Sequence, residues 1–297
     1  MRIAHLSDLH FGKHDEELAK GLAAEVASQS PDLVVVSGDF TQRGTAAEFE
    51  AARAFLDTLD VPFFAVPGNH DIPLANVVKR FVNPYGLYKR YISAEVEPFL
   101  EIDGVALAGL RTSRRARLGF NWADGTISRD QLKDLENRFA KSSPDAVRII
   151  VAHHPLMHPE EPMARPMRRV KRADLALAAF ARLGVRLVLS GHFHMSYVRR
   201  HEQGLEITAG APVGANEAAA APVMVAQAST TISTRRRAGH LNAYNLIDIE
   251  DGKIEVNLRE WQGEGWRNRE STGNKPQKPA PKKKAKPKRA LARSPKS

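Results

Sequence analysis

Residues 186–194 read RLVLSGHFH, an apolar run that stops at a glycine and is followed by two histidines. A short, continuous apolar run predicts a strand that is buried on both faces. Gly191 allows the chain to turn closely, and in an extended segment the i, i+2 spacing directs the rings of His192 and His194 to the same side. The stretch therefore predicts a pair of imidazoles at the end of a buried strand.

Four further apolar runs end in the same way, at a cluster of polar residues. They are RIAHLSDLH from residue 2, DLVVVSGD from residue 32, VPFFAVPGNHD from residue 61 and VRIIVAHHP from residue 147. Apolar residues with helical spacing lie between the runs, in residues 18–26, 49–59 and 132–139, the last after a predicted N-cap at Ser128. Alternating strands and helices predict an α/β layered architecture.

Later segments extend this pattern. A further helix is predicted from about Ala173 to a C-cap at Gly184. Residues 242–261 alternate apolar and polar side chains around Asp251-Gly252, which predicts a β-hairpin. The stretch 213–239, which contains NEAAAAP and TRRR, carries no pattern that assigns it.

The composition limits the classes of protein to consider. The chain has 297 residues, 42% of them hydrophobic, which is enough for a full core in one large domain or two small ones. It has no cysteine, so disulfides and thiolate metal sites are excluded and a metal would be held by nitrogen and oxygen. No apolar run approaches the roughly 20 residues that span a bilayer, and no signal-peptide core is present, so we expect a soluble, cytoplasmic protein.

The net charge of +10 is concentrated at the C-terminal end. Residues 271–297 hold eight lysines, two arginines and no acidic residue, together with many prolines. This composition predicts a folded domain over residues 1–268 and a disordered basic tail over residues 269–297. We expect weak contact of residues 275–296 with polyanions such as nucleic acid or anionic lipid. The oligomeric state stays open, a dimer included.

Polar residues recur at the carboxyl ends of the predicted strands, where α/β sheets bind their ligands. They are Asp8 and His10, Asp39, Asn69 and His70, His153 and His154, and His192 and His194. A single strand-end Asp usually caps a helix, and a single His is usually a hydrogen-bonded core or surface group. Helix capping, however, does not account for so many histidines on one rim. The set fits a two-metal centre, in which two divalent ions clamp an oxyanion and activate a water.

The blocks DLH, GDFTQRG, GNHD, HHP and GHFH, in this order, resemble the motifs of the calcineurin-like metallophosphoesterases. The resemblance covers residues 1 to about 265 and implies a four-layer αββα sandwich. It also implies two ligand sets that share Asp39: Asp8, His10, Asp39 and His194 for one ion, and Asp39, Asn69, His153 and His192 for the other. His153 is preferred to His154 because the family's ligand is the first His of such pairs. His5 and His154 are expected to be packing or supporting groups.

The resemblance further implies how the reaction proceeds. A hydroxide between the two ions would attack phosphorus, and His70, which is not a ligand, would lie near the leaving oxygen as proton donor or transition-state stabiliser. Asp71 has two readings: it orients His70 as part of the catalytic group, or it organises the loop. The nitrogen and oxygen donors admit several metals; iron and manganese are expected, with zinc and cobalt as further candidates.

The segment GDFTQRGTAAEFEAARAFL, followed by VPGNHD, resembles the bacterial class III branch of cyclic-nucleotide and glycerophosphodiester phosphodiesterases. The predicted substrate is a small phosphodiester, with 3',5'-cyclic AMP as the leading candidate. Arg111, Arg114 and Arg115 are candidates to meet a phosphate. The alternatives are a nucleotide-sugar or lipid-linked pyrophosphatase, a DNA nuclease of the same fold, or a metal-free protein-binding scaffold. The scaffold is disfavoured because every motif position is filled.

Overall fold

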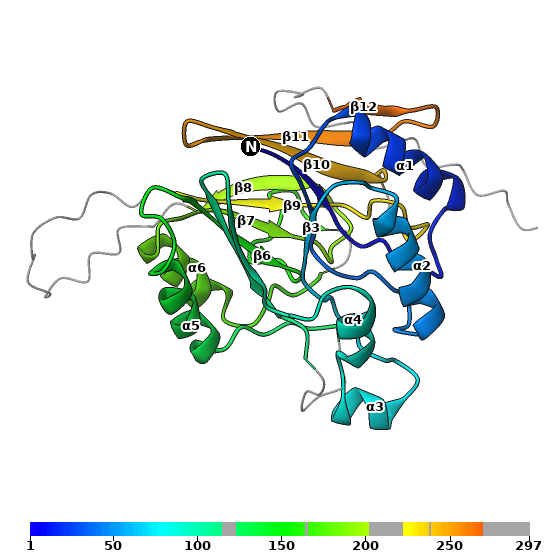
Figure 1. The fold of residues 1–297 in the computed structure, drawn as a ribbon, viewed down its shortest axis with the longest axis horizontal. Coiled ribbons are helices and arrows are strands. Elements are labelled where there is room, and N and C mark those ends of the chain that lie inside the picture. The colour runs from blue at the N-terminus through cyan, green and yellow to red at the C-terminus, as the bar shows by residue number, and fades with distance from the viewer. Residues whose placement is uncertain (115–122, 164–165, 202–221, 238, 270–297) are drawn as a thin grey trace, which may run out of the picture.

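A computed structural model describes residues 1–114, 123–163, 166–201, 222–237 and 239–269 (Figure 1). Two six-stranded sheets face each other, and helices cover the outer face of each. This arrangement confirms the predicted four-layer α/β sandwich. The predicted tail, including residues 275–296, lies outside the described residues from position 270 onward.

The first sheet joins the two ends of the domain. Its strands are, in spatial order, β12 (Trp266–Asn268), β11 (Lys253–Trp261), β10 (Ala243–Glu250), β1 (Arg2–Leu6), β2 (Leu33–Val36) and β3 (Phe63–Ala65). Strands β1, β2 and β3 are parallel, and β10 pairs antiparallel with β1. Glu250 pairs with Lys253, so Asp251 and Gly252 form a two-residue turn with φ values of 47° and 71°. Positive φ at both positions suits the tight turn of a hairpin, and the predicted hairpin is confirmed.

The second sheet contains, in spatial order, β4 (Phe99–Ile102), β5 (Val105–Leu110), β6 (Val147–Ala152), β7 (Val185–Ser190), β9 (Val223–Gln227) and β8 (Tyr197–His201). Strands β5, β6, β7 and β9 are parallel. Strand β9 falls within the stretch that the sequence did not assign. Its five residues are too few for a distinct periodicity, and pairing with β7, from Leu187↔Met224 to Ser190↔Gln227, decides that it is a strand.

The predicted helices are present, and two short ones accompany them. They are α1 (Glu16–Ser28), α2 (Ala46–Asp57), α3 (Val77–Val82), α4 (Gly86–Tyr91), α5 (Arg129–Phe139) and α6 (Ala173–Arg182). Ser128 caps α5 as predicted: its hydroxyl accepts from the Gln131 backbone N–H, and the Gln131 side chain accepts from the Ser128 N–H. In the described part of the chain, no helix combines the length and apolar character needed to cross a membrane.

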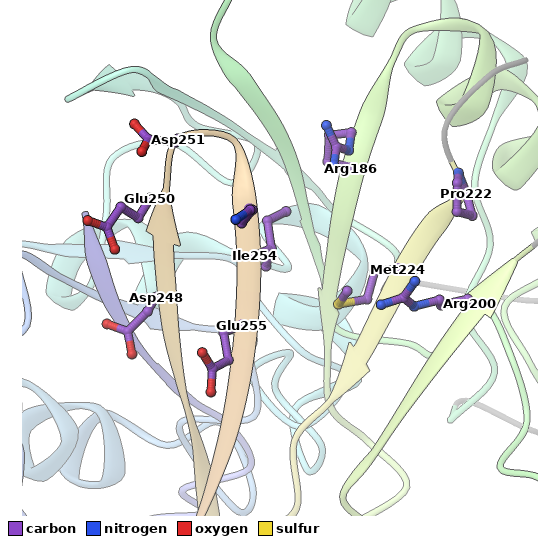
Figure 2. Close-up of a pocket in the computed structure, with 10 residues that line it drawn as sticks. Arg186, Arg200, Pro222, Met224, Asp248, Glu250, Asp251, Ile254 and Glu255 are labelled. Atoms are coloured by element: carbon purple, nitrogen blue, oxygen red, sulfur yellow. The ribbon is translucent and has the colours of Figure 1, made fainter.

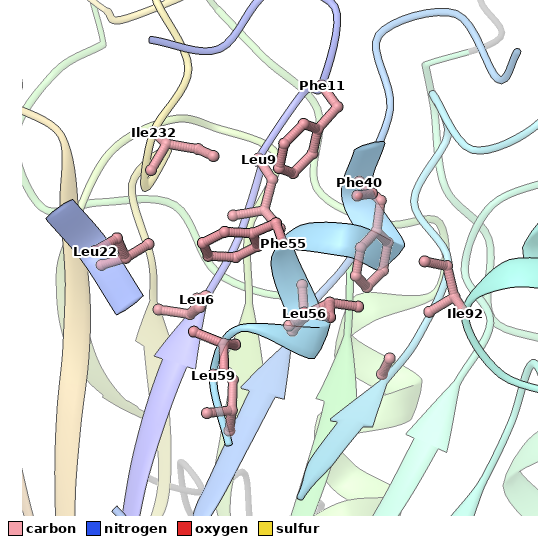
Figure 3. Packing of buried hydrophobic residues seen from close by; sticks show 14 of the residues in the cluster. Leu6, Leu9, Phe11, Leu22, Phe40, Phe55, Leu56, Leu59, Ile92 and Ile232 are labelled. Carbon is pink, nitrogen blue, oxygen red and sulfur yellow. The ribbon is translucent and has the colours of Figure 1, made fainter. Parts of the chain in front are cut away.

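The core explains why the strand sequences are continuously apolar. Along β2, Leu33 and Val35 belong to the layer between the sheets, whereas Val34 and Val36 belong to the layer beneath the helices. Figure 3 shows the helix-side layer, with Leu22 of α1 and other apolar side chains gathered near the end of β1. Burial on both faces holds the strand ends, and the loops that follow them, in place.

A hollow of about 580 Å³ opens where β7 begins and β10 turns into β11. Figure 2 shows Arg186 on one side of it and the carboxylates of Glu250 and Asp251 on the other. His192 and His194 lie at the opposite end of β7, after its last residue, Ser190. This hollow is therefore separate from the predicted site.

Candidate metal centre

The predicted site residues lie in the loops that follow β1, β2, β3, β6 and β7. They are Asp8, His10, Asp39, Asn69, His70, Asp71, His153, His192 and His194. Although the five loops belong to different parts of the sequence, the side chains converge: among the described residues, the ligating groups of each of four sets lie within 4.8 Å of one another. One of these sets, Asp8 with His10 and His194, forms a first cluster, and a second cluster of Asp39, Asn69, His153 and His192 lies beside it.

The first cluster consists of Asp8, His10 and His194. The Nε2 atom of His194 lies 3.1 Å from Asp8 Oδ1 and 3.2 Å from His10 Nε2. The other ring nitrogen of each histidine faces a backbone carbonyl, at 3.3 Å for His10 and 2.6 Å for His194. A carbonyl only accepts, so Nδ1 carries the proton in each neutral ring and Nε2 presents a lone pair.

Three hydrogen-bond acceptors, Nε2 of His10, Nε2 of His194 and Oδ1 of Asp8, therefore face one another, and none of the three supplies a hydrogen. Asp8 Oδ1 is buried and has no hydrogen-bond partner. A buried acceptor in this state destabilises the fold unless something compensates it. The donor set fits a divalent cation held by nitrogen and oxygen.

The second cluster is built around His153. Its Nε2 atom lies 3.3 Å from Asp39 Oδ2 and 3.2 Å from Asn69 Oδ1, and its Nδ1 atom lies 2.8 Å from the Ser37 carbonyl. Burial lowers the pKa of His153, but the Asp39 carboxylate raises it to about 9 overall. Asp39 Oδ2 is also 3.7 Å from His10 Nε2. Asp39 thus lies between the two clusters.

His192 and His154 lie beside His153 but differ in their partners. The ring centroid of His192 is 5.2 Å from that of His153. In His154, Nδ1 is 2.7 Å from the Thr112 hydroxyl and Nε2 is 2.9 Å from the Ala123 carbonyl. Burial lowers the pKa of His154 to about 3. Because both ring nitrogens are engaged, His154 is a supporting group, and the contacts favour His153 as the ligand.

Five of the seven predicted ligands have positive φ. The values are 52° for Asp8, 49° for His10, 56° for Asp39, 73° for His192 and 54° for His194. The assumption of an extended segment at His192 and His194 is therefore wrong, and the two rings point to different clusters. Such conformations cost about 1–3 kcal/mol each and concentrate at functional sites.

Two glycines permit the close approach of these loops. A Cβ atom at Gly191 would overlap Ser7 Oγ and Asp8 Oδ2, and one at Gly68 would overlap Asp39 Oδ1. The sequence predicted that Gly191 allows a close turn of its own chain; in the structure its φ is not positive, and the missing side chain instead admits Ser7 and Asp8 of the loop after β1.

A buried chain of hydrogen bonds ends on Asp8. Asn245 Nδ2 donates to His5 Nδ1 (3.1 Å), His5 Nε2 to Ser37 Oγ (2.9 Å), Ser37 to Ser7 (2.9 Å), and Ser7 to Asp8 Oδ2 (2.7 Å). The backbone N–H of His192 also donates to Oδ2, at 2.8 Å. Because Oδ2 is satisfied by these donors, Oδ1 is the oxygen left for the first cluster.

His70 and Asp71 occupy different environments. The Asp71 carboxylate accepts from the backbone N–H groups of Thr41 (3.0 Å) and Gly68 (2.8 Å), and burial together with the Asp39 charge raises its pKa to about 7. His70 is oriented instead by Gln42, whose carbonyl lies 2.7 Å from Nδ1. These contacts favour the loop-organising reading of Asp71.

The comparison with known proteins agrees with this geometry. The model of the family described as calcineurin-like phosphoesterase matches residues 1–196. The chain belongs to this family. This calcineurin-like phosphoesterase is accordingly a hydrolase of phosphoric esters in a family that depends on divalent metal ions.

The phosphoesterase is similar in sequence to curated phosphodiesterases and in fold to solved phosphatases. It is 28% identical over 232 residues to a probable cyclic nucleotide phosphodiesterase of Synechococcus sp., covering 72% of this chain and 81% of the relative. It is 32% identical over 127 residues to a probable glycerophosphodiester phosphodiesterase of Arcobacter nitrofigilis, covering 42% of each. A dimetal phosphatase from Danio rerio shares the fold, with a TM-score of 0.57 at 13% identity over 87% of this chain and 95% of that one.

Two of the three arginines expected to meet phosphate have other partners. The Arg111 guanidinium lies over the Tyr85 ring, 5.6 Å from its centroid, and Arg114 donates to the Thr126 carbonyl at 3.1 Å. Arg115 lies outside the described residues. A different arginine, Arg235, reaches the site, 3.3 Å from His70 Nε2. The TRRR sequence was its only signal, and nothing in its spacing linked it to a histidine 165 positions away.

Proposed function

We propose that this phosphoesterase hydrolyses a small phosphodiester at a two-metal centre, with 3',5'-cyclic AMP as the leading candidate. The observation that carries the proposal is the position of Asp39, whose Oδ2 atom lies 3.7 Å from His10 Nε2 in the first cluster and 3.3 Å from His153 Nε2 in the second. The names of the relatives support the substrate class, since they are probable phosphodiesterases of cyclic nucleotides and of glycerophosphodiesters.

We infer two ligand sets, which the two clusters support. One ion would be held by Asp8, His10, Asp39 and His194, and the other by Asp39, Asn69, His153 and His192. Iron or manganese suits these nitrogen and oxygen donors, and zinc or cobalt would also be accepted. When bound, such ions neutralise phosphoryl oxygens and lower the pKa of water.

The chain's own residues prepare the reaction. Ser7 and the His192 backbone occupy Asp8 Oδ2 and so direct Oδ1 into the site. His70 Nδ1 is committed to the Gln42 carbonyl, which makes Nε2 the ring atom that exchanges protons. We assign to Nε2 the uptake of a proton from solvent and its transfer to the leaving oxygen as the bond from phosphorus to that oxygen breaks. Asp71 holds the loops on which His70 and Asp39 stand.

Substrate selectivity provides the test. Purified protein reconstituted with Mn(II) would be assayed with bis-p-nitrophenyl phosphate, p-nitrophenyl phosphate, cyclic AMP and single-stranded DNA. We expect kcat/KM for the diester to exceed that for the monoester, together with turnover of cyclic AMP. Preferential cleavage of the monoester or of DNA would overturn the proposed substrate class. Absence of both metal binding and turnover would instead favour the scaffold alternative.

A further inference from the structure

We propose that Arg235 binds the phosphoryl group of the substrate, as a cation supplied to the metal centre by the loop after β9. This inference rests on the proposed function and adds a substrate-contacting residue to it. Its grounds are the backbone of the loop, the direction of the guanidinium and the chemistry of the phosphoryl group.

The backbone of Arg235 is part of the centre. Its carbonyl accepts from Nδ1 of His194 at 2.6 Å, and its N–H donates to Ser233 Oγ at 3.1 Å. The hydrogen bond to His194 presents Nε2 of that ring to the first cluster. The backbone of Arg235 is therefore fixed next to His194, a predicted metal ligand.

Buried hydrogen bonds hold the preceding residues against the loop after β1. Thr230 Oγ1 donates to the Asp8 carbonyl at 2.6 Å, and the Thr231 N–H donates to the Ser7 carbonyl at 3.0 Å. Ser233 Oγ donates to the Lys13 carbonyl at 3.1 Å. These residues are almost fully buried, so the start of the Arg235 side chain is held at a defined place.

The Arg235 side chain reaches over the exposed side of His70. Its Nη1 atom lies 3.3 Å from His70 Nε2 and 3.2 Å from Gln42 Oε1. Both contacts use the same nitrogen, and the residue itself is exposed. The N–H groups on Nε and Nη2 of Arg235 are thus available to a ligand bound beside His70, the residue to which we assign proton transfer to the leaving oxygen.

The chemistry of a phosphodiester matches this position. Negative charge on its non-bridging oxygens persists through the reaction, and preorganised cations stabilise it most effectively. A guanidinium binds two such oxygens at once, which an ammonium cannot do with the same geometry. Arg235 would therefore add orientation as well as charge.

The test compares Arg235→Ala and Arg235→Lys with Arg236→Ala. Arg236 is the adjacent exposed arginine; it lines a separate hollow with Thr234 and His240, and the structure describes no contact of its side chain with the predicted ligands. The measurements are bound Mn(II) per chain, kcat/KM for bis-p-nitrophenyl phosphate, and calorimetric titration of the Mn(II)-loaded proteins with inorganic phosphate.

We expect all three variants to keep their metal. For Arg235→Ala, kcat/KM should fall about 100-fold and phosphate affinity should fall with it, whereas Arg235→Lys recovers part of both and Arg236→Ala resembles the unchanged protein. Equal phosphate affinity and kcat/KM in Arg235→Ala and Arg236→Ala would overturn the inference. Loss of metal in both Arg235 variants would also overturn it, in favour of a role in positioning His194. If the unchanged protein turned over no diester, the proposed function would fail, while the phosphate titration would still report on Arg235.

Discussion

The Nε2 atoms of His10 and His194 lie 3.2 Å apart, although 184 residues separate the two histidines in the sequence. Each ring has its Nδ1 atom against a backbone carbonyl, so the two facing nitrogens are acceptors. Asp8 Oδ1 lies beside these two nitrogens and has no hydrogen-bond partner. A cation between these atoms removes the conflict, whereas its removal leaves buried acceptors uncompensated.

Removal of metal should therefore destabilise the protein. We expect the melting temperature to fall on treatment with a chelator and to recover on addition of Mn(II), because only the folded chain assembles the ligands. Differential scanning calorimetry checks this, with Mn(II)-saturated chelator as the control for the reagent itself. If neither the chelator nor Mn(II) changed the melting temperature, the assignment of these residues as metal ligands would be contradicted.

Substitutions at Asp39 and at His70 should have different effects, the first on metal binding and the second on proton transfer. Asp39→Asn should weaken both ions because its carboxylate lies between the clusters. His70→Ala should keep both ions but lower kcat by about 10²–10⁴-fold, as expected for loss of a general acid. Metal analysis beside steady-state kinetics distinguishes the two. If Asp39→Asn retained both ions and full activity, the shared-ligand assignment would be wrong.

Gly191→Ala should damage the site through packing alone. The added methyl group would overlap Ser7 Oγ and Asp8 Oδ2, so we expect the free energy of unfolding to fall by about 1–3 kcal/mol and metal to bind more weakly. Gly21→Ala is the matched control, since a Cβ atom there meets nothing within 4 Å and α1 gains helix propensity. Urea unfolding of both variants gives the comparison. Equal stability of the two would rule out the steric explanation.

His5 should make stability depend on pH. Burial lowers its folded-state pKa to about 3, against an ordinary value of 6.5. Below pH 6.5 the unfolded chain takes up a proton on His5 that the folded chain does not, so stability is lost as pH falls from 6.5 toward 3. The loss is at most about 1.4 kcal/mol per pH unit.

The comparison for His5 is the His5→Gln variant, which cannot titrate. With metal removed from both proteins, the free energy of unfolding of the variant should fall less between pH 7 and pH 5 than that of the unchanged protein. Other titrating groups are common to both and cancel in the difference. Parallel pH profiles would show that His5 is not held neutral by the fold.

The sequence by itself determined the elements and the donors. Continuous apolar runs specify strands buried on both faces, Ser128 and the Asp251-Gly252 turn specify boundaries, and the motif residues predict a metal site of nitrogen and oxygen donors. These features are local, because each depends on side chains a few positions apart.

The tertiary structure decided the rest. Strand β9 exists through its pairing with β7, five of the seven predicted ligands adopt left-handed backbone conformations under the constraint of neighbouring loops, and Arg235 meets His70 across 165 positions. None of these has a local signature, since pairing partners, strained φ values and long-range contacts are set by how the two sheets pack. The core between the sheets supplies the free energy that maintains them.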